Sequence, residues 1–159
     1  MQSYLFKNIQ VVNEGKIMFS DVLTHGERIE KIDNQINVAR RVTEINGENL
    51  HLFPGVIDDQ VHFREPGLTH KADIFSESRA AVAGGVTSFM EMPNTIPNAL
   101  TLNLLEDKYS IASRSSLANY SFYMGVSNDN AEEVLRCVKF KKNICGIKIF
   151  MGTSTGNML

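Results

Sequence analysis

The chain has 159 residues, with 16 Lys and Arg against 18 Asp and Glu, which gives a formal net charge of −2. This balance argues against a nucleic-acid-binding module built on a basic patch and against an acidic disordered tail. Hydrophobic residues make up 43% of the chain, a proportion typical of a packed protein. No stretch approaches the ~20 apolar residues that span a bilayer, and the N-terminus lacks the plan of a signal peptide. We therefore expect a soluble, cytoplasmic protein.

The first segment, residues 1–53, is predicted to be a small, mostly antiparallel β region. Short apolar and β-branched runs at 9–11, 17–19 and 28–32 are separated by polar turns such as 13–15. This segment shows no residues whose spacing indicates chemistry. The two cysteines, Cys137 and Cys145, match no zinc or redox spacing, and they are predicted to be reduced thiols in packed positions.

From residue 54 onward the sequence alternates between strands and helices. Apolar runs at 56–63, 86–92, 120–126 and 146–150 predict four strands that begin roughly thirty residues apart. Asp73, Thr101 and Asp129 are predicted to cap the three helices between them. Strands that alternate with helices in this way form a parallel α/β sheet, either open and doubly wound or closed as an eight-unit barrel. Periodicity does not choose between the two, and four units would make half of a barrel.

Polar residues at the end of the first strand are the first candidates for a site, because functional groups of parallel α/β folds collect at the carboxyl ends of the strands. Alternation along the strand predicts that Gln60, His62 and Arg64 lie on one side. An imidazole there could bind a metal, and a guanidinium could hold a carboxylate through two parallel hydrogen bonds. The alternative is a hydrogen-bonded histidine and a surface arginine at an ordinary strand end.

Two further strand ends carry candidates. Asn94 offers a donor and an acceptor to a small polar ligand, although 94–97 is also ordinary turn sequence. Lys148 lies between Ile147 and Ile149, so alternation predicts an inward ammonium. Burial lowers the pKa of a lysine, which can then react with carbon dioxide to give a carbamate, an anionic ligand for metal. The alternative is a lysine paired with an inward Asp or Glu. No phosphate-binding glycine loop is present, so a nucleotide site is not expected.

Three motifs together resemble the type I dihydroorotases of the amidohydrolase superfamily: PGVIDDQVHFREPG (54–67), AGGVTSFMEMPNT (83–95) and GIKIFMGTSTGNML (146–159). The resemblance implies part of a small β-sandwich over 1–53 and the first four strands of a (β/α)8 TIM-type barrel over 54–159. It also implies zinc-dependent, reversible cyclisation of N-carbamoyl-L-aspartate to L-dihydroorotate in pyrimidine biosynthesis. The expected partners are this small-molecule substrate and, in the complete enzyme, a second copy in a homodimer, with no nucleic acid or membrane.

The same resemblance implies a role for each candidate residue. His62 matches the second histidine of an HxH metal motif, and Lys148 matches the lysine that becomes carboxylated (N6-carboxylysine) and bridges two metals. Arg64 and Asn94 match the residues that hold the substrate's carboxylate. Arg64 favours dihydroorotase over the related allantoinases and dihydropyrimidinases (hydantoinases), because their substrates carry no ring carboxylate.

The sequence departs from the family pattern in two ways. Gln60 stands where the family has the first HxH histidine, and an amide oxygen is a poorer zinc ligand than an imidazole. This leaves open an enzyme with one metal, or a non-catalytic scaffold that partners aspartate transcarbamoylase. The second departure is length: the family's later barrel units supply two more metal histidines and the aspartate that acts as general acid and base. We therefore expect the N-terminal portion of a longer enzyme, inactive by itself.

Overall fold

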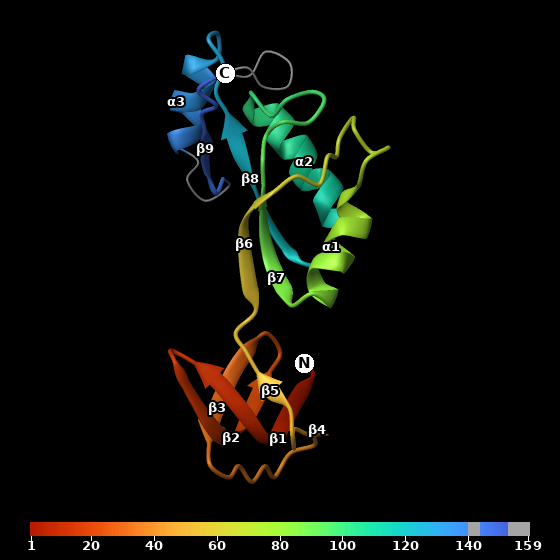
Figure 1. The fold of residues 1–159 in the computed structure, drawn as a ribbon, viewed down its shortest axis with the longest axis vertical. Coiled ribbons are helices and arrows are strands. Elements are labelled where there is room, and N and C mark those ends of the chain that lie inside the picture. Colours follow the sequence, from red (N-terminus) through yellow and green to blue (C-terminus); the bar gives the residue numbers. More distant parts are fainter. Residues whose placement is uncertain (140–143, 153–159) are drawn as a thin grey trace. The chain divides into compact units, whose positions relative to one another are not determined.

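The computed structural model describes residues 1–139 and 144–152, which fall into two compact units. Unit 1 comprises Met1–Pro54 and unit 2 comprises Gly55–Leu159. Figure 1 shows that unit 1 contains strands and unit 2 contains strands and helices. None of the described helices is long and apolar enough to cross a membrane.

Unit 1 is one five-stranded sheet with the order β3-β2-β1-β4, in which β5 also pairs with β1. Its strands are β1 (Ser3–Asn13), β2 (Lys16–His25), β3 (Arg28–Asp33), β4 (Thr43–Asn46) and β5 (His51–Leu52). The hairpin pairs β1–β2 and β2–β3 are antiparallel, whereas β4 and β5 run parallel to β1. The prediction of a mostly antiparallel region is therefore confirmed for β1, β2 and β3, and the short strands β4 and β5 are exceptions to it. The residues between β3 and β4 carry the chain back along the sheet, so that β4 runs parallel to β1. No short turn motif in the sequence predicts this path.

A buried carboxylate organises an irregularity in this sheet. The β1–β2 register shifts between Phe6 and Ile9, and Asn8 has a φ of 56°, in the left-handed region. Asp21 of β2 is 2% exposed, and its two carboxylate oxygens accept hydrogen bonds from the backbone N–H groups of Asn8 and Ile36, both at 2.9 Å. The first bond satisfies a backbone group that the bulge removes from the ladder, and the second satisfies a buried backbone group in the segment after β3.

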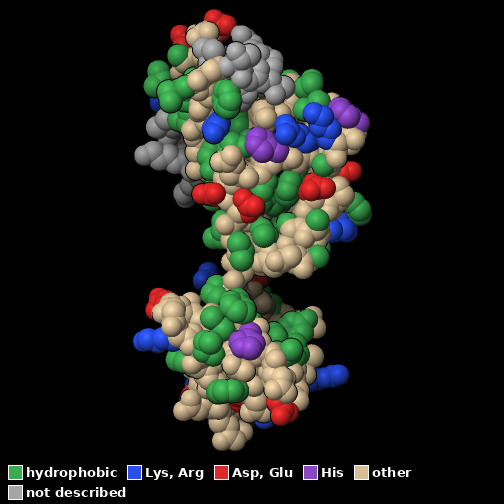
Figure 2. Space-filling model, viewed as in Figure 1, with side chains coloured by type: hydrophobic (Ala, Val, Ile, Leu, Met, Phe, Trp, Pro, Cys, Tyr) green, Lys and Arg blue, Asp and Glu red, His purple; other side chains and the backbone are tan. Residues whose placement is uncertain are grey.

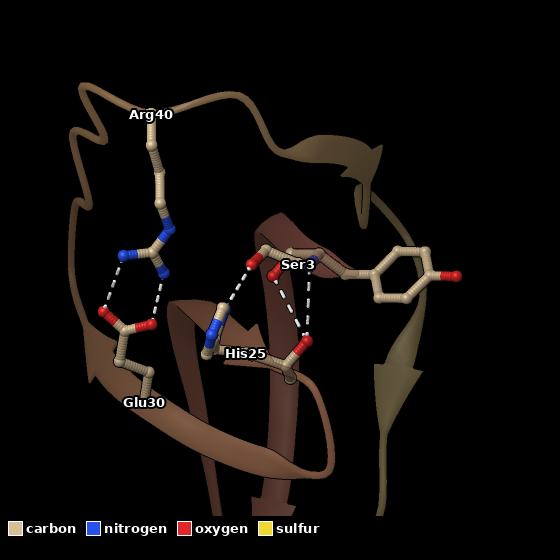
Figure 3. Close-up of polar contacts among 6 residues, drawn as sticks. Ser3, His25, Glu30 and Arg40 are labelled. Atoms are coloured by element: carbon tan, nitrogen blue, oxygen red, sulfur yellow. Dashed lines mark hydrogen bonds and ion pairs between the residues drawn. The ribbon is translucent and has the colours of Figure 1, made fainter. Parts of the chain in front are cut away.

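Figure 3 shows further polar contacts between side chains of unit 1. Ser3 Oγ lies 2.8 Å from His25 Nδ1, and Arg40 pairs with both carboxylate oxygens of Glu30. The Arg40 and Glu30 side chains are exposed. An exposed ion pair of this kind contributes little to stability.

Unit 2 is a four-stranded parallel sheet with the order β6-β7-β8-β9, and helices connect its successive strands. In chain order its elements are β6 (Val56–Val61), α1 (Ile74–Ala83), β7 (Val86–Glu91), α2 (Leu102–Ser115), β8 (Asn119–Gly125), α3 (Ala131–Lys139) and β9 (Gly146–Lys148). All four predicted strands and all three predicted helices are present. The first and last strands end two residues earlier than the apolar runs suggest, and the predicted α/β fold is confirmed.

Two of the three predicted helix caps are confirmed. The Asp73 carboxylate accepts a hydrogen bond from Ser76 N at 2.7 Å, and Thr101 Oγ1 accepts one from Leu104 N at 3.3 Å. The third helix begins at Ala131, so Asn130, rather than Asp129, directly precedes it. The buried Asn130 side chain bonds to the backbone of residues 100, 125 and 127.

Helices α1 and α2 lie side by side against the sheet of unit 2 (Figure 1), and the core lies beneath them. Phe89 of β7 and Phe122 of β8 are almost fully buried, and Tyr109 of α2 meets the Phe122 ring edge-on at a centroid distance of 4.9 Å. Cys137 is buried in this core and Cys145 is partly buried, and both are free thiols as predicted. The strands β6 and β9 are the two edges of the described sheet.

Candidate functional site

The carboxyl ends of β6 and β7 bring two loops together: the β6 loop (62–68) and the β7 loop (92–98). The ladder between the two strands extends to their last residues, where Met92 N donates to Val61 O at 3.0 Å. In the first residue after β6, His62, the ring Nδ1 lies 2.8 Å from Asn94 Oδ1. Two residues singled out from the sequence, 32 positions apart, are thus in direct contact.

This contact determines how the His62 ring can act. A carbonyl-type amide oxygen only accepts hydrogen bonds, so Nδ1 carries the hydrogen, and in a neutral ring Nε2 is then the nitrogen with the free lone pair. Metal-binding histidines characteristically donate their other ring N–H to an oxygen in this way, which fixes the tautomer and the ring orientation. The imidazole is exposed, and its Nε2 is thereby prepared to act as a ligand.

Arg64 does not continue the alternation of β6. The strand ends at Val61, and Arg64 has a φ of 71°, which is rarely adopted by residues other than glycine. The argument that alternation puts Gln60, His62 and Arg64 on one side therefore fails beyond the strand end. Figure 2 shows histidine side chains beside Lys and Arg side chains on one face of unit 2.

The β6 loop is fixed against the β7 loop and against α1. Ile96 N donates to Pro66 O at 3.1 Å, and a Cβ added at Gly67 would lie 2.0 Å from Ile96 O. Gly67 also has a φ of +83°, so both space and backbone conformation require glycine there. Glu65 accepts a hydrogen bond from Ile74 N, the first residue of α1, at 2.9 Å. The loop that carries His62 and Arg64 is thus held at several points.

A buried ion pair lies directly behind these loops, and sequence reasoning missed it. Glu91, the last residue of β7, lies 2.8 Å from Lys108 Nζ through its Oε2, and each side chain is 1% exposed. Glu91 Oε1 accepts a hydrogen bond from Arg64 N at 3.0 Å, and Lys108 Nζ donates to Met92 O at 3.3 Å. Two sequence signals pointed to this pair: a single charge in the apolar run 86–92, and a lysine three residues after Leu105 on the apolar side of its helix.

Burial dominates the electrostatics of this pair. It raises the pKa of Glu91, against the lowering effects of Lys108 and of the backbone N–H groups of residues 64 and 63. Burial likewise lowers the pKa of Lys108, which Glu91 opposes. The buried lysine partnered by a carboxylate, which the sequence suggested for position 148, is therefore found at position 108.

Lys148 is the last residue of β9, an edge strand that pairs with β8. It is half-buried, and its carbonyl accepts a hydrogen bond from Val126 N at 3.0 Å. The flanking Ile147 and Ile149 are 40% and 60% exposed, so neither belongs to the buried core of the described residues. Within the same described ranges, neither Lys148 nor Gln60 forms a hydrogen bond or ion pair with His62, Arg64 or Asn94.

The described residues supply one suitable metal ligand rather than a complete site. His62 has the correct chemistry and the second hydrogen bond that such a ligand requires. Across residues 1–139 and 144–152, however, no group of three or more His, Cys, Asp and Glu side chains could together hold a metal ion. These residues thus fit part of a zinc site, and further ligands would have to come from elsewhere or from chemical modification.

Comparison with known proteins identifies relatives over nearly the whole chain, although no family model matches it. An allantoinase from Solibacter usitatus is 34% identical over 155 residues, which are 97% of this chain and 33% of that protein. A dihydroorotase from Carboxydothermus hydrogenoformans is 49% identical over 90 residues, which are 57% of this chain and 21% of that protein. The chain therefore spans about a third or less of the length of the curated relatives it matches.

A solved structure supports the same assignment for the fold. The L-hydantoinase (dihydropyrimidinase) from Arthrobacter aurescens superimposes with a TM-score of 0.90 over 99% of this chain and 35% of that one, at 24% sequence identity. The parallel sheet of unit 2 corresponds to the first strands of the TIM-type barrel of these proteins. Together, the relatives and the fold show that the chain is similar to the N-terminal part of cyclic amidohydrolases, a group that includes allantoinases, dihydroorotases and hydantoinases.

Proposed function

We propose that this chain contributes to the active site of a dihydroorotase, which interconverts N-carbamoyl-L-aspartate and L-dihydroorotate in pyrimidine biosynthesis. The observation that carries the proposal is the 2.8 Å contact between His62 Nδ1 and Asn94 Oδ1. His62 precedes Arg64 by two residues in the sequence. The contact between His62 and Asn94 supports the proposal because a candidate metal ligand, an amide and an arginine-bearing loop all follow the same end of two neighbouring strands.

The proposed substrate follows from the groups at this end of the sheet. L-Dihydroorotate carries a ring carboxylate, which a guanidinium binds through two parallel hydrogen bonds. Because Asn94 Oδ1 is engaged by His62, the Asn94 NH2 group is left to donate to the same carboxylate. Arg64 and Asn94 would then orient the substrate, while His62 would hold the metal beside the bond that reacts.

We propose zinc as the cofactor, with His62 Nε2 as one ligand and Lys148, once carboxylated, as another. Gln60 stands where the family has the first HxH histidine and supplies at most a weak amide ligand. When bound, zinc would lower the pKa of a water molecule to about 7 and polarise the carbonyl that is attacked. The remaining ligands and the general acid and base are not among the residues described.

Replacing Arg64 by methionine tests the substrate assignment. Arg64→Met should lower kcat/KM for dihydroorotate about 100-fold, because a charge-assisted pair of hydrogen bonds is lost. The assay is turnover by the longest product of the gene. Arg79→Met is the matched control, since Arg79 is an exposed arginine of α1 that stacks on Phe75. Equal turnover by Arg64→Met and Arg79→Met would contradict the assignment of the carboxylate-binding role.

Replacing Lys148 by alanine tests the zinc assignment. The metal content of the same product should fall in Lys148→Ala and should recover partly when a short carboxylic acid replaces the missing carbamate oxygens. Lys139→Ala, at the exposed end of α3, should keep its zinc. Full zinc occupancy in Lys148→Ala would refute the carbamate.

Allantoinase activity is the second candidate function, because an allantoinase is 34% identical over 97% of this chain. It predicts turnover of a substrate without a carboxylate and no effect of Arg64→Met. A third outcome, less than one zinc per chain and no turnover of either substrate, would favour the non-catalytic scaffold that Gln60 suggests, with aspartate transcarbamoylase as its partner.

A further inference from the structure

The buried carboxylate of Glu91 contacts the loop that carries two of the proposed site residues. Its Oε1 accepts the backbone N–H of Arg64 at 3.0 Å, and its Oε2 faces Lys108 Nζ at 2.8 Å. Glu91 is the last residue of the neighbouring strand β7, and it precedes Asn94 in the β7 loop by three residues. One side chain therefore connects the backbone of the β6 loop with the strand that leads into the β7 loop.

We propose that Glu91 is a positioning residue: its carboxylate, held by Lys108, fixes the backbone at Arg64 and thereby the position of His62 against Asn94. The inference rests on the proposed function only in taking Arg64, His62 and Asn94 as the residues that act. It assigns to Glu91 no contact with substrate or metal.

The backbone conformation of Arg64 explains why the β6 loop needs such an acceptor. A residue other than glycine at a φ of 71° is strained and persists only where the surroundings impose this conformation. A hydrogen bond from its N–H to a carboxylate is charge-assisted and is strong where water is excluded. The neighbouring Phe63 is buried and packs on Phe89 at a centroid distance of 4.4 Å, which anchors the other side of the turn.

Stability alone does not account for this ion pair. Replacing a buried ion pair by apolar residues of similar size is often neutral or stabilising, because both charges must be removed from water. The pair in this chain is 1% exposed at each side chain and lies directly behind the β6 and β7 loops. The ion pair holds a hydrogen-bond acceptor in place for Arg64 N, and an apolar pair would not supply one.

Two double variants separate positioning from stability. Glu91→Gln with Lys108→Met removes both charges and keeps an amide oxygen for Arg64 N. Glu91→Leu with Lys108→Met removes both charges and the acceptor. Both variants lose the buried charges together, so neither is left with an unpaired ion, and equilibrium unfolding of each is measured beside the parent chain.

The readouts are two NMR signals that need neither substrate nor metal. Hydrogen exchange of the Arg64 amide should be at least about tenfold faster in the Leu/Met variant than in the Gln/Met variant. The ring nitrogen signals of His62, measured at about pH 8 where an ordinary imidazole is neutral, should show one tautomer in the parent chain and in the Gln/Met variant. In the Leu/Met variant they should show a mixture of tautomers.

Unchanged Arg64 exchange and an unchanged His62 tautomer in a folded Leu/Met variant would overturn the inference. So would equal losses of both signals in the two variants, since the retained acceptor would then have no effect. In the longest gene product, KM for dihydroorotate should rise about tenfold in the Leu/Met variant and return in the Gln/Met variant. If dihydroorotate is not turned over at all, the proposed function fails, whereas the two NMR signals still decide the role of Glu91.

Discussion

Replacing Lys108 by methionine should destabilise unit 2 strongly, because it leaves the Glu91 carboxylate buried without its counter-ion. Methionine matches the length of the lysine stem, so the change removes the charge with little change of volume. Both side chains are 1% exposed, so solvent does not screen the loss. Breaking a buried pair by removing one partner costs about 3–5 kcal/mol, a large part of the ~5–15 kcal/mol that stabilises a typical domain.

This loss of stability should depend on pH in a defined direction. Burial already raises the pKa of Glu91 above its ordinary value of 4.5, and Lys108 opposes that rise, so the pKa is higher still in Lys108→Met. A folded carboxyl with a raised pKa binds a proton more readily than the unfolded chain does. Stability of the variant therefore increases as the pH falls through the folded pKa towards 4.5. The deficit should be largest at about pH 8 and smaller at about pH 5.

Urea unfolding followed by helical circular dichroism measures this effect, since the described helices all lie in unit 2. The control is Lys108→Met combined with Glu91→Leu, which should recover stability to within about 1–2 kcal/mol of the parent chain. The reasoning is refuted if Lys108→Met unfolds at the parent's urea concentration at about pH 8, or if its deficit grows as the pH falls.

Three further substitutions test the local structure. Thr101→Ala removes the N-cap of α2 and should cost about 1 kcal/mol in urea unfolding, whereas Thr101→Ser should cost little. Gly67→Ala should destabilise by about 1–3 kcal/mol, because φ is positive and the Cβ meets Ile96 O, and a neutral result would contradict the close packing of the two loops. Asp21→Ala should destabilise unit 1 by about 2–4 kcal/mol through two unpaired backbone N–H groups. Slow hydrogen exchange at Ile36 in that variant would count against this role.

Local patterns were sufficient to predict the elements of unit 2. Asp73 and Thr101 cap helices because their side-chain oxygens reach backbone N–H groups three positions ahead, a rule that depends only on nearby residues. The apolar runs likewise marked all four strands. Local patterns did not predict the direction of strand pairing where it depends on a distant partner. Strands β4 and β5 pair parallel to β1 because of the path that the chain takes between the strands.

For the candidate site, the sequence by itself determined which residue types follow each strand, and so singled out His62, Arg64 and Asn94. Only the tertiary structure decided that His62 meets Asn94 and that Arg64 leaves the strand's alternation. It also decided that the buried lysine is Lys108, because a side chain's burial depends on which helix packs behind which strand. Spacing along the chain describes one strand or helix at a time, whereas these contacts join residues between 16 and 32 positions apart.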